Sequence, residues 1–152
     1  MDFFIKFILP IITIIISVGN VCFTIFSLTR ESKKYRSTLR RIYIEKIFND
    51  YLINKIPLTR NKISYAENLG FLSLDELGEI ISFLRKDILY FKYNSEKFYD
   101  ELDRILVSFE DFLASKIGRK IEIQSDREDV QNKINEHIYK IYKRVDSHYS
   151  GK

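Results

Sequence analysis

Apolar residues are concentrated near the start of the chain, in one uninterrupted run. Residues 7–28 read FILPIITIIISVGNVCFTIFSL and contain no charged side chain. A helix rises about 1.5 Å per residue, so this run would be about 33 Å long, close to the roughly 30 Å hydrocarbon core of a bilayer. A core helix of a soluble protein would carry a polar stripe of charges along such a length. The pattern therefore predicts one transmembrane helix within residues 1–29.

After this run the pattern changes to apolar residues at helical spacing with charged outer faces, over residues 30–152. The first such segment, residues 32–55, is expected to continue the transmembrane helix as one rod that ends near Lys55, because Pro57 disfavours a helical residue before it. Residues 58–72 are turn-like, with room for one short helix. Three amphipathic helices follow, and their apolar faces are Leu77, Ile80, Ile81, Leu84, Ile88 and Phe91; Phe98, Leu102, Ile105, Leu106, Phe109, Leu113 and Ile117; and Val130, Ile134, Ile138, Ile141 and Val145.

Local signals predict where these helices begin and end. Ser73 with Glu76, and Ser125 with Glu128, have the spacing of a capping box at a helix N-terminus. Gly118 is expected to end the helix before it. No stretch alternates like a β-strand. The fold class expected is all-α: one transmembrane helix that runs into a small bundle of about four helices.

The charges around the apolar run predict its orientation. A cleaved signal peptide does not fit, because the run is too long, its positive charge follows it and no small-x-small site closes it. Only Asp2 and Lys6 precede the run, whereas six cations follow it with Glu31 as their only acidic neighbour. By the positive-inside rule the domain of residues 30–152 is cytoplasmic and the N-terminus lies outside, in a bacterial inner membrane. The six cations are Arg30, Lys33, Lys34, Arg36, Arg40 and Arg41.

Polar residues inside the apolar run repeat at one spacing. There are five such residues, from Thr13 to Ser27, and they follow one another in steps of four, three, four and three. This spacing places them on one side of a slightly supercoiled helix. Such a stripe suits hydrogen bonds between packed membrane helices, or the lining of a water-filled path. Ser and Thr can instead bond their own backbone, but the amide of Asn20 cannot be fully satisfied that way. We therefore expect self-association, with a pore or an oligomer interface at Thr13, Ser17, Asn20, Thr24 and Ser27.

The basic cluster has two readings. Residues 30–62 hold ten Lys or Arg against three acids, whereas residues 63–152 hold fourteen against seventeen. A basic cluster beside a membrane helix attracts anionic lipid headgroups, and we expect these headgroups to be its binding partner. The interleaved Tyr35 and Tyr43 would suit stacking on nucleic-acid bases, which leaves RNA as the alternative.

Signals for catalysis are weak. The chain has no phosphate-binding glycine loop, no Cys/His cluster with metal spacing and no serine nucleophile motif. His137 adjoins the apolar stripe of its helix, which favours a core or interface histidine. The acidic clusters at residues 100–103 and 110–111 are expected on a solvated face. We therefore expect no cofactor, no metal and no small-molecule substrate.

One pair near the C-terminus resembles a known motif. Arg144 and His148, with Val145, Asp146 and Ser147 between them, resemble the Arg…His motif with which HEPN domains cleave RNA, although the spacing is one residue short. The layout of a span, a basic helix and a helical bundle is similar to that of the single-span accessory proteins of type VI-B CRISPR systems. That resemblance implies a HEPN-like bundle, assembly into membrane pores and a role in antiphage defence.

Three functions follow as hypotheses. The first is a homo-oligomeric membrane effector that depolarises or permeabilises the membrane, with an RNA-guided nuclease or RNA as a possible trigger. The second is a membrane-tethered RNase or nucleotide-binding module that uses Arg144 and His148. The third is a membrane scaffold with no activity of its own. The first is the function that we expect, and it makes the protein no enzyme.

Overall fold

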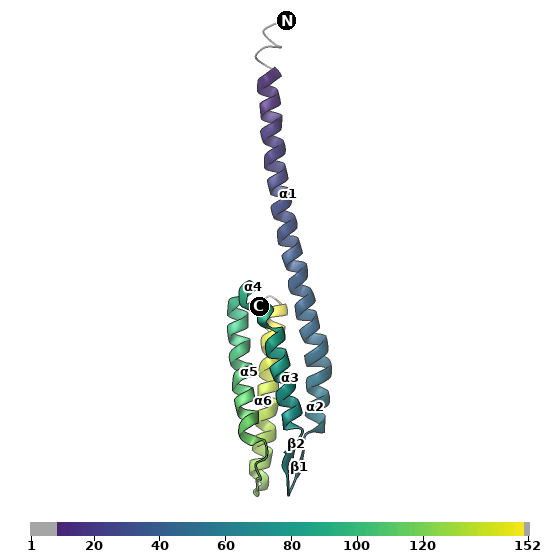
Figure 1. Cartoon of the computed structure of the whole chain (residues 1–152), viewed down its shortest axis with the longest axis vertical. Helices are drawn as coiled ribbons and strands as arrows, with labels where there is room; N and C mark the ends of the chain where they lie inside the picture. Colours follow the sequence, from purple (N-terminus) through teal and green to yellow (C-terminus); the bar gives the residue numbers. More distant parts are fainter. Residues whose placement is uncertain (1–8, 151–152) are drawn as a thin grey trace. The chain divides into compact units, whose positions relative to one another are not determined.

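A computed structural model describes residues 9–150, with side chains from residue 14 onward (Figure 1). Asp2 and Lys6, which entered the prediction of orientation, lie outside these residues, and so does the side chain of Thr13. The described chain is mostly helical, which confirms the all-α class. It divides into two compact units between Ile42 and Tyr43.

Helix α1 runs from Leu9 to Lys46 and supplies most of the first unit. Together with the helical residues that follow it as far as Lys62, α1 forms one continuous helix. Among the described residues, this is the one helix that is long and apolar enough to cross a membrane. The exposed fraction of its large apolar side chains between Ile14 and Leu28 lies between 57% and 73%. In water such a surface would be costly, because roughly 25 cal/mol is gained for each Å² of apolar surface removed from water.

The second unit, which begins within the last turn of α1, contains an unusual helix. After α1 the backbone continues as a π-helix, η2 (Ile47–Lys55), and then without a break as α2 (Ile56–Lys62). The N–H of Ile56 donates to the carbonyl of Tyr51, five residues back, and Ile56 is helical with φ −62° and ψ −50°. The expected end of the helix near Lys55 is therefore wrong. In an α-helix the ring of Pro57 would clash with the carbonyl four residues before it, and the wider π turn relieves that clash.

The π-helix leaves one backbone carbonyl to be satisfied from outside. In the same five-residue pattern the donor to the carbonyl of Leu52 would be residue 57, which is proline and has no N–H. Tyr142, from helix α6 (Gln124–Tyr149), donates its hydroxyl to that carbonyl instead. Burial of the Tyr142 hydroxyl raises its pKa, so it stays protonated and able to donate.

Tyr142→Phe is expected to lower the free energy of unfolding by about 1–2 kcal/mol, because it leaves the Leu52 carbonyl without a donor. Tyr139→Phe, at a side chain that is 63% exposed on the same helix, should change it by less than about 0.5 kcal/mol. Pro57→Ala restores an N–H at residue 57, so Tyr142→Phe should cost less in that background. Urea unfolding of the wild type, of Pro57→Ala, of Tyr142→Phe and of the double variant measures the coupling. Strictly additive costs would contradict this account of the π-helix.

A second tyrosine ties the π-helix to helix α3 (Leu74–Asp87). The buried Tyr51 donates its hydroxyl to Asp87 Oδ2 at 2.7 Å, and Lys46 Nζ lies 3.2 Å from the same oxygen. Burial and this hydrogen bond raise the pKa of Tyr51. Burial opposes ionisation of Asp87, but the bonds from Tyr51 and Lys46 outweigh it and lower the pKa of Asp87. The three groups form one ionic cluster at the C-terminal end of α3.

Two short strands follow α2, which the sequence did not predict. Strands β1 (Ser64–Ala66) and β2 (Gly70–Leu72) pair antiparallel, with Ser64 opposite Leu72. The strands have three residues each, too few to show an alternating pattern. The hairpin is therefore held by contacts distant in sequence rather than by its own propensity.

Those contacts join the hairpin to the connection between helices α5 (Glu96–Lys116) and α6. The Tyr65 hydroxyl donates to the Ile121 carbonyl at 2.7 Å and accepts from the Ile121 N–H at 2.8 Å. The Arg127 guanidinium covers the Tyr65 ring at 4.0 Å. At the other strand, Gly70 has φ +81°, and a Cβ there would lie 2.5 Å from the carbonyl oxygen of Arg119. The hairpin and the connection thus form one interlocked end of the bundle.

The core lies where α5 packs against both α3 and α6 (Figure 1). Arg85 of α3 pairs with Asp103 at 2.7 Å and with Glu110 at 3.1 Å across the first of these contacts. The three predicted apolar faces are confirmed except at Ile117, which is exposed, and at Ile80, Ile105 and Ile138, which are half-buried. The expected helix through Phe91 is divided at Ile88 into α3 and α4 (Leu89–Asn94).

Of the predicted helix ends, the C-terminal end of α5 is confirmed and the two N-terminal capping boxes are wrong. Gly118 follows α5 with φ +69°, so the predicted stop is confirmed. Both capping boxes are wrong. Ser73 has φ +61° instead of the extended conformation of an N-cap, and its side chain makes no capping bond. Helix α6 begins one residue before Ser125, at Gln124, so this serine lies inside the first turn.

Candidate functional site

The polar face of α1 is the first candidate. We use this name for the five residues Thr13, Ser17, Asn20, Thr24 and Ser27. At about 100° per residue they fall within an arc of about 80°. Thr24 donates its hydroxyl to the carbonyl of Asn20 at 2.8 Å, so this hydroxyl is satisfied within the helix. The amide of Asn20 is exposed and has no hydrogen-bond partner among the described residues.

This difference separates the residues of the polar face by chemistry. A threonine bonded to its own backbone presents a methyl group outward and needs no partner. An asparagine amide has two donors and one acceptor, and hydrocarbon supplies partners for none of them. Asn20 is therefore, among the described side chains of this face, the one with the most hydrogen-bonding groups that need a partner from outside the helix.

The basic cluster lies just beyond the apolar run of α1. All six of its side chains are exposed. The six charges are distributed along about three turns of helix. They produce a positive potential at an open helix surface rather than in a cavity. Such a surface can hold phosphate groups of a membrane or of a nucleic acid, and both would weaken with salt. The cations are Arg30, Lys33, Lys34, Arg36, Arg40 and Arg41.

Arg144 and His148 lie together, one turn apart on α6, around the ring of Phe98 from α5. The His148 ring stacks on Phe98 at 3.9 Å between centroids with 11° between the planes. The Arg144 guanidinium carbon lies 5.0 Å from the same ring centroid. These groups line a shallow cavity of about 420 Å³ with residues from the start of α5.

Arg144 is already committed to a partner in this arrangement. Its Nε lies 2.8 Å from Glu101 Oε2, as an ion pair rather than an aligned hydrogen bond. Another nitrogen, Nη1, donates to Ser147 Oγ at 3.1 Å. An arginine that is to hold a phosphate would have to leave Glu101 or share its charge with it. The sequence could not show this, because Glu101 is forty-three residues away along the chain.

His137 lies half-buried between α6 and α5. Its ring is parallel to Phe109 at 4.9 Å with 3° between the planes, and it also stacks on Phe112 at 5.6 Å. Nδ1 is buried without a hydrogen-bond partner among the described residues. Burial, and then the charge of Lys140, lower the pKa of His137, while Glu136 opposes this. The neutral ring thus acts as an aromatic packing group in this contact.

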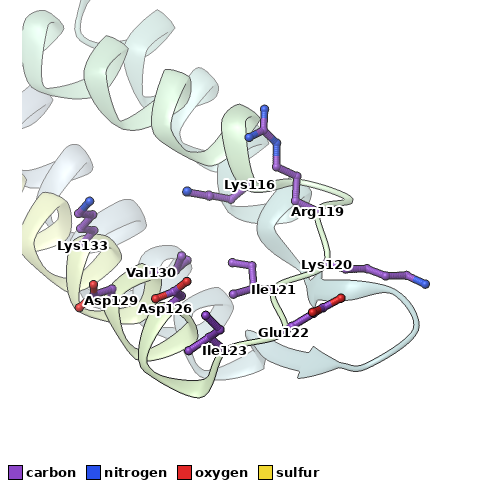
Figure 2. A pocket seen from close by; sticks show the side chains of 10 residues that line it. All are labelled: Lys116, Arg119, Lys120, Ile121, Glu122, Ile123, Asp126, Asp129, Val130 and Lys133. Atoms are coloured by element: carbon purple, nitrogen blue, oxygen red, sulfur yellow. The ribbon is translucent and has the colours of Figure 1, made fainter.

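A larger cavity of about 520 Å³ lies beside the α5–α6 connection, and the sequence did not point to it. Figure 2 shows Lys116 of α5 and Lys133 of α6 on its two sides, with Lys120 directed away from it. Asp126 and Asp129 stand among these cations. Because the two signs of charge are mixed, the cavity has no clear preference for an anion or a cation.

The acidic clusters are used mainly in ion pairs. Glu101 pairs with Arg144, and Asp103 and Glu110 both pair with Arg85. Within residues 14–150, no three metal-ligating side chains come together. A comparison of this chain with protein-family models, with curated proteins and with solved structures finds no match.

Proposed function

We propose that this chain is a single-span membrane protein that self-associates through the polar face of α1 and acts by changing the permeability of the membrane. The observation that carries the proposal is the amide of Asn20, which is exposed and has no partner among the described residues, in a stretch of helix that contains no charge and whose large side chains are apolar. A second copy of the chain can supply the missing donor and acceptor, since the same amide stands at the same depth in each copy.

The basic cluster supports an anchoring role at the membrane surface. Arg30, Lys33 and Lys34 follow the apolar run directly, and each cation near an anionic leaflet contributes about 1 kcal/mol of binding. The same charges favour a cytoplasmic location for the bundle. Through the resemblance to type VI-B accessory proteins, we extend the proposal to antiphage defence, with membrane depolarisation as the output.

The alternative of a tethered RNase has less support. Arg144 and His148 share one ring, but the arginine is paired with Glu101 and the histidine is stacked flat on Phe98. For catalysis, a base must reach the proton that it removes, and an arginine must face the charge that develops. The structural role of both side chains explains their position, so we do not propose an activity for them.

Asn20→Leu in the full chain is expected to reduce dye leakage from vesicles that contain anionic lipid. Polar contacts between membrane helices contribute about 0.6–2 kcal/mol each, so association should weaken on the order of 3- to 30-fold per interface. Val18→Leu introduces leucine on the opposite side of α1. Vesicles with this variant should release as much dye as vesicles with the wild type. Equal leakage of both variants would contradict the role of Asn20, and the absence of leakage from the wild type would contradict the pore.

A further inference from the structure

Glu31 continues the spacing of the polar face past the apolar run. The residues of that face follow one another in steps of four, three, four and three, and Glu31 comes four residues after the last of them, Ser27. Helix α1 is α-helical from Leu9 to Lys46, so the side of each residue can be followed at about 100° per residue. On that scale Glu31 lies at the centre of the arc that the polar face covers. The acid therefore stands on the same side of the helix as Asn20.

The carboxylate of Glu31 is open to its surroundings. It is exposed and makes no ion pair or hydrogen bond with another described residue, although the six cations of the basic cluster lie close to it in the sequence. The apolar run ends at Leu28, so Glu31 lies about 4.5 Å beyond it along the helix axis. This is the depth of the lipid headgroups. A pore lined by the polar face would open there, at its cytoplasmic mouth.

The cations of the basic cluster lie on other sides of the helix. The nearest to the centre of the polar face is Lys34, about 60° away, whereas Arg40 lies about 180° away. The uncharged Tyr35 and Thr38 follow Glu31 on its own side, within about 40° of the centre. In a ring of helices with the polar faces inward, the positive charges would therefore face the lipid headgroups, and the acid would face the mouth.

An acid at this position distinguishes a water-filled ring from a closed contact between helices. Copies inserted in one membrane share one orientation and one depth, so each copy brings the same carboxylate to the same level. In a dry contact these like charges would repel one another and lose their hydration. Around a water-filled path each carboxylate stays hydrated, and the ring attracts permeating cations, as rings of Asp or Glu do in cation channels.

We propose that Glu31 forms a ring of carboxylates at the cytoplasmic mouth of the pore and makes the pore selective for small cations, such as K⁺ and Na⁺, over anions. The inference rests on the proposed pore, and it adds the class of ion that passes. The other residues of the polar face carry no charge, so along this face the sign of the selectivity is set by Glu31.

Reversal potentials of the full chain in planar bilayers, across a gradient of KCl, test this proposal. The wild type is expected to pass K⁺ at least about tenfold more readily than Cl⁻, because a ring of fixed charge concentrates counter-ions at the mouth. Glu31→Gln should bring the permeability ratio close to one, whereas Glu31→Asp should keep it. Raising the salt from about 0.1 M to about 1 M shortens the Debye length from about 10 Å to about 3 Å, so the wild-type ratio should fall.

Two further variants test the place of the charge and its side of the helix. Asp111→Asn removes the same charge from an exposed carboxylate of the bundle that has no ion pair among the described residues. This variant should keep the wild-type permeability ratio. Thr29→Glu, added to Glu31→Gln, places an acid at nearly the same depth but about 160° round the helix, and it should not restore the selectivity.

The outcomes separate this inference from the pore itself. A wild type without conductance would contradict the pore and the ring together. A wild-type pore that does not prefer K⁺, or that keeps its preference in Glu31→Gln, would leave the pore standing and overturn the role of Glu31. Restoration by Thr29→Glu would also overturn the ring, because that acid does not face the mouth. If Glu31→Gln failed to assemble, the wild type would still decide, since a preference that did not fall with salt would contradict a ring of exposed charge.

Discussion

Gly70→Ala is expected to lower the free energy of unfolding of the bundle by about 3 kcal/mol, and its melting temperature by about 10 °C. Two causes act together at this position. A left-handed φ of +81° costs a residue with a side chain about 1–2 kcal/mol, and the added Cβ would lie 2.5 Å from the carbonyl oxygen of Arg119. That oxygen belongs to the backbone, so relief requires the hairpin to move away from the α5–α6 connection.

The chain offers two controls for this change. Gly118 also has a positive φ of +69° but has no atom within 4 Å of a Cβ, so Gly118→Ala should show only the conformational cost. Gly78 lies inside α3 with open space around it, and Gly78→Ala should stabilise by about 0.5–1 kcal/mol. Thermal unfolding of the full chain in detergent, followed through the near-ultraviolet signal of its tyrosines, measures all three. If Gly70→Ala cost no more than Gly118→Ala, the hairpin would not be interlocked with the connection.

Phe98→Ala should have an effect at least as large, about 3–5 kcal/mol, because it removes a buried ring from the centre of three contacts. Phe98 is 2% exposed, stacks on His148, and meets Phe91 edge to face at 5.0 Å. The guanidinium of Arg144 also lies over the Phe98 ring. The cavity left behind would remove the support of both polar residues at once.

Two further variants separate lost volume from lost aromatic contact. Phe98→Leu keeps most of the volume and should cost less than about 2 kcal/mol, whereas Phe83→Ala, at a side chain that is 54% exposed, should cost less than about 1 kcal/mol. The upfield NMR shift of the His148 ring protons should become smaller in both Phe98 variants, with Phe91 as the remaining aromatic neighbour at 6.0 Å between centroids. A shift that is unchanged in Phe98→Ala would show that His148 does not stack on the Phe98 ring.

Much of the fold could be predicted from the sequence because it depends on local periodicity. The apolar faces of α3, α5 and α6 follow directly from the 3.6-residue repeat, and the end of α5 follows from the freedom of Gly118 at positive φ. The long apolar helix α1 was predicted in the same way.

The features that were missed depend on contacts distant in sequence. The strands are three residues long and are held by Tyr65 on Ile121, fifty-six positions away. The helical state of Ile56 before Pro57 depends on a π-helix whose open carbonyl is satisfied by Tyr142, ninety positions after Leu52. No local pattern contains these partners, so a propensity argument predicted a helix end there.

The candidate sites also differ in whether they depend on a local pattern or on contacts distant in sequence. The polar face of α1 is a property of one helix, so its spacing could be found in the sequence alone. The surroundings of Arg144 and His148 could not, because Phe98 and Glu101 come from another helix. Their spacing suggested chemistry, whereas the ring and the acid around them explain the pair by packing and charge.

The most direct test of the central claim is the mass of the full chain in detergent micelles, by native mass spectrometry or light scattering. We expect one discrete oligomer for the wild type and for Val18→Leu, and a shift to smaller species for Asn20→Leu. A wild-type protein that is monomeric in several detergents would contradict self-association through α1, and an unchanged oligomer in Asn20→Leu would contradict the part assigned to its amide.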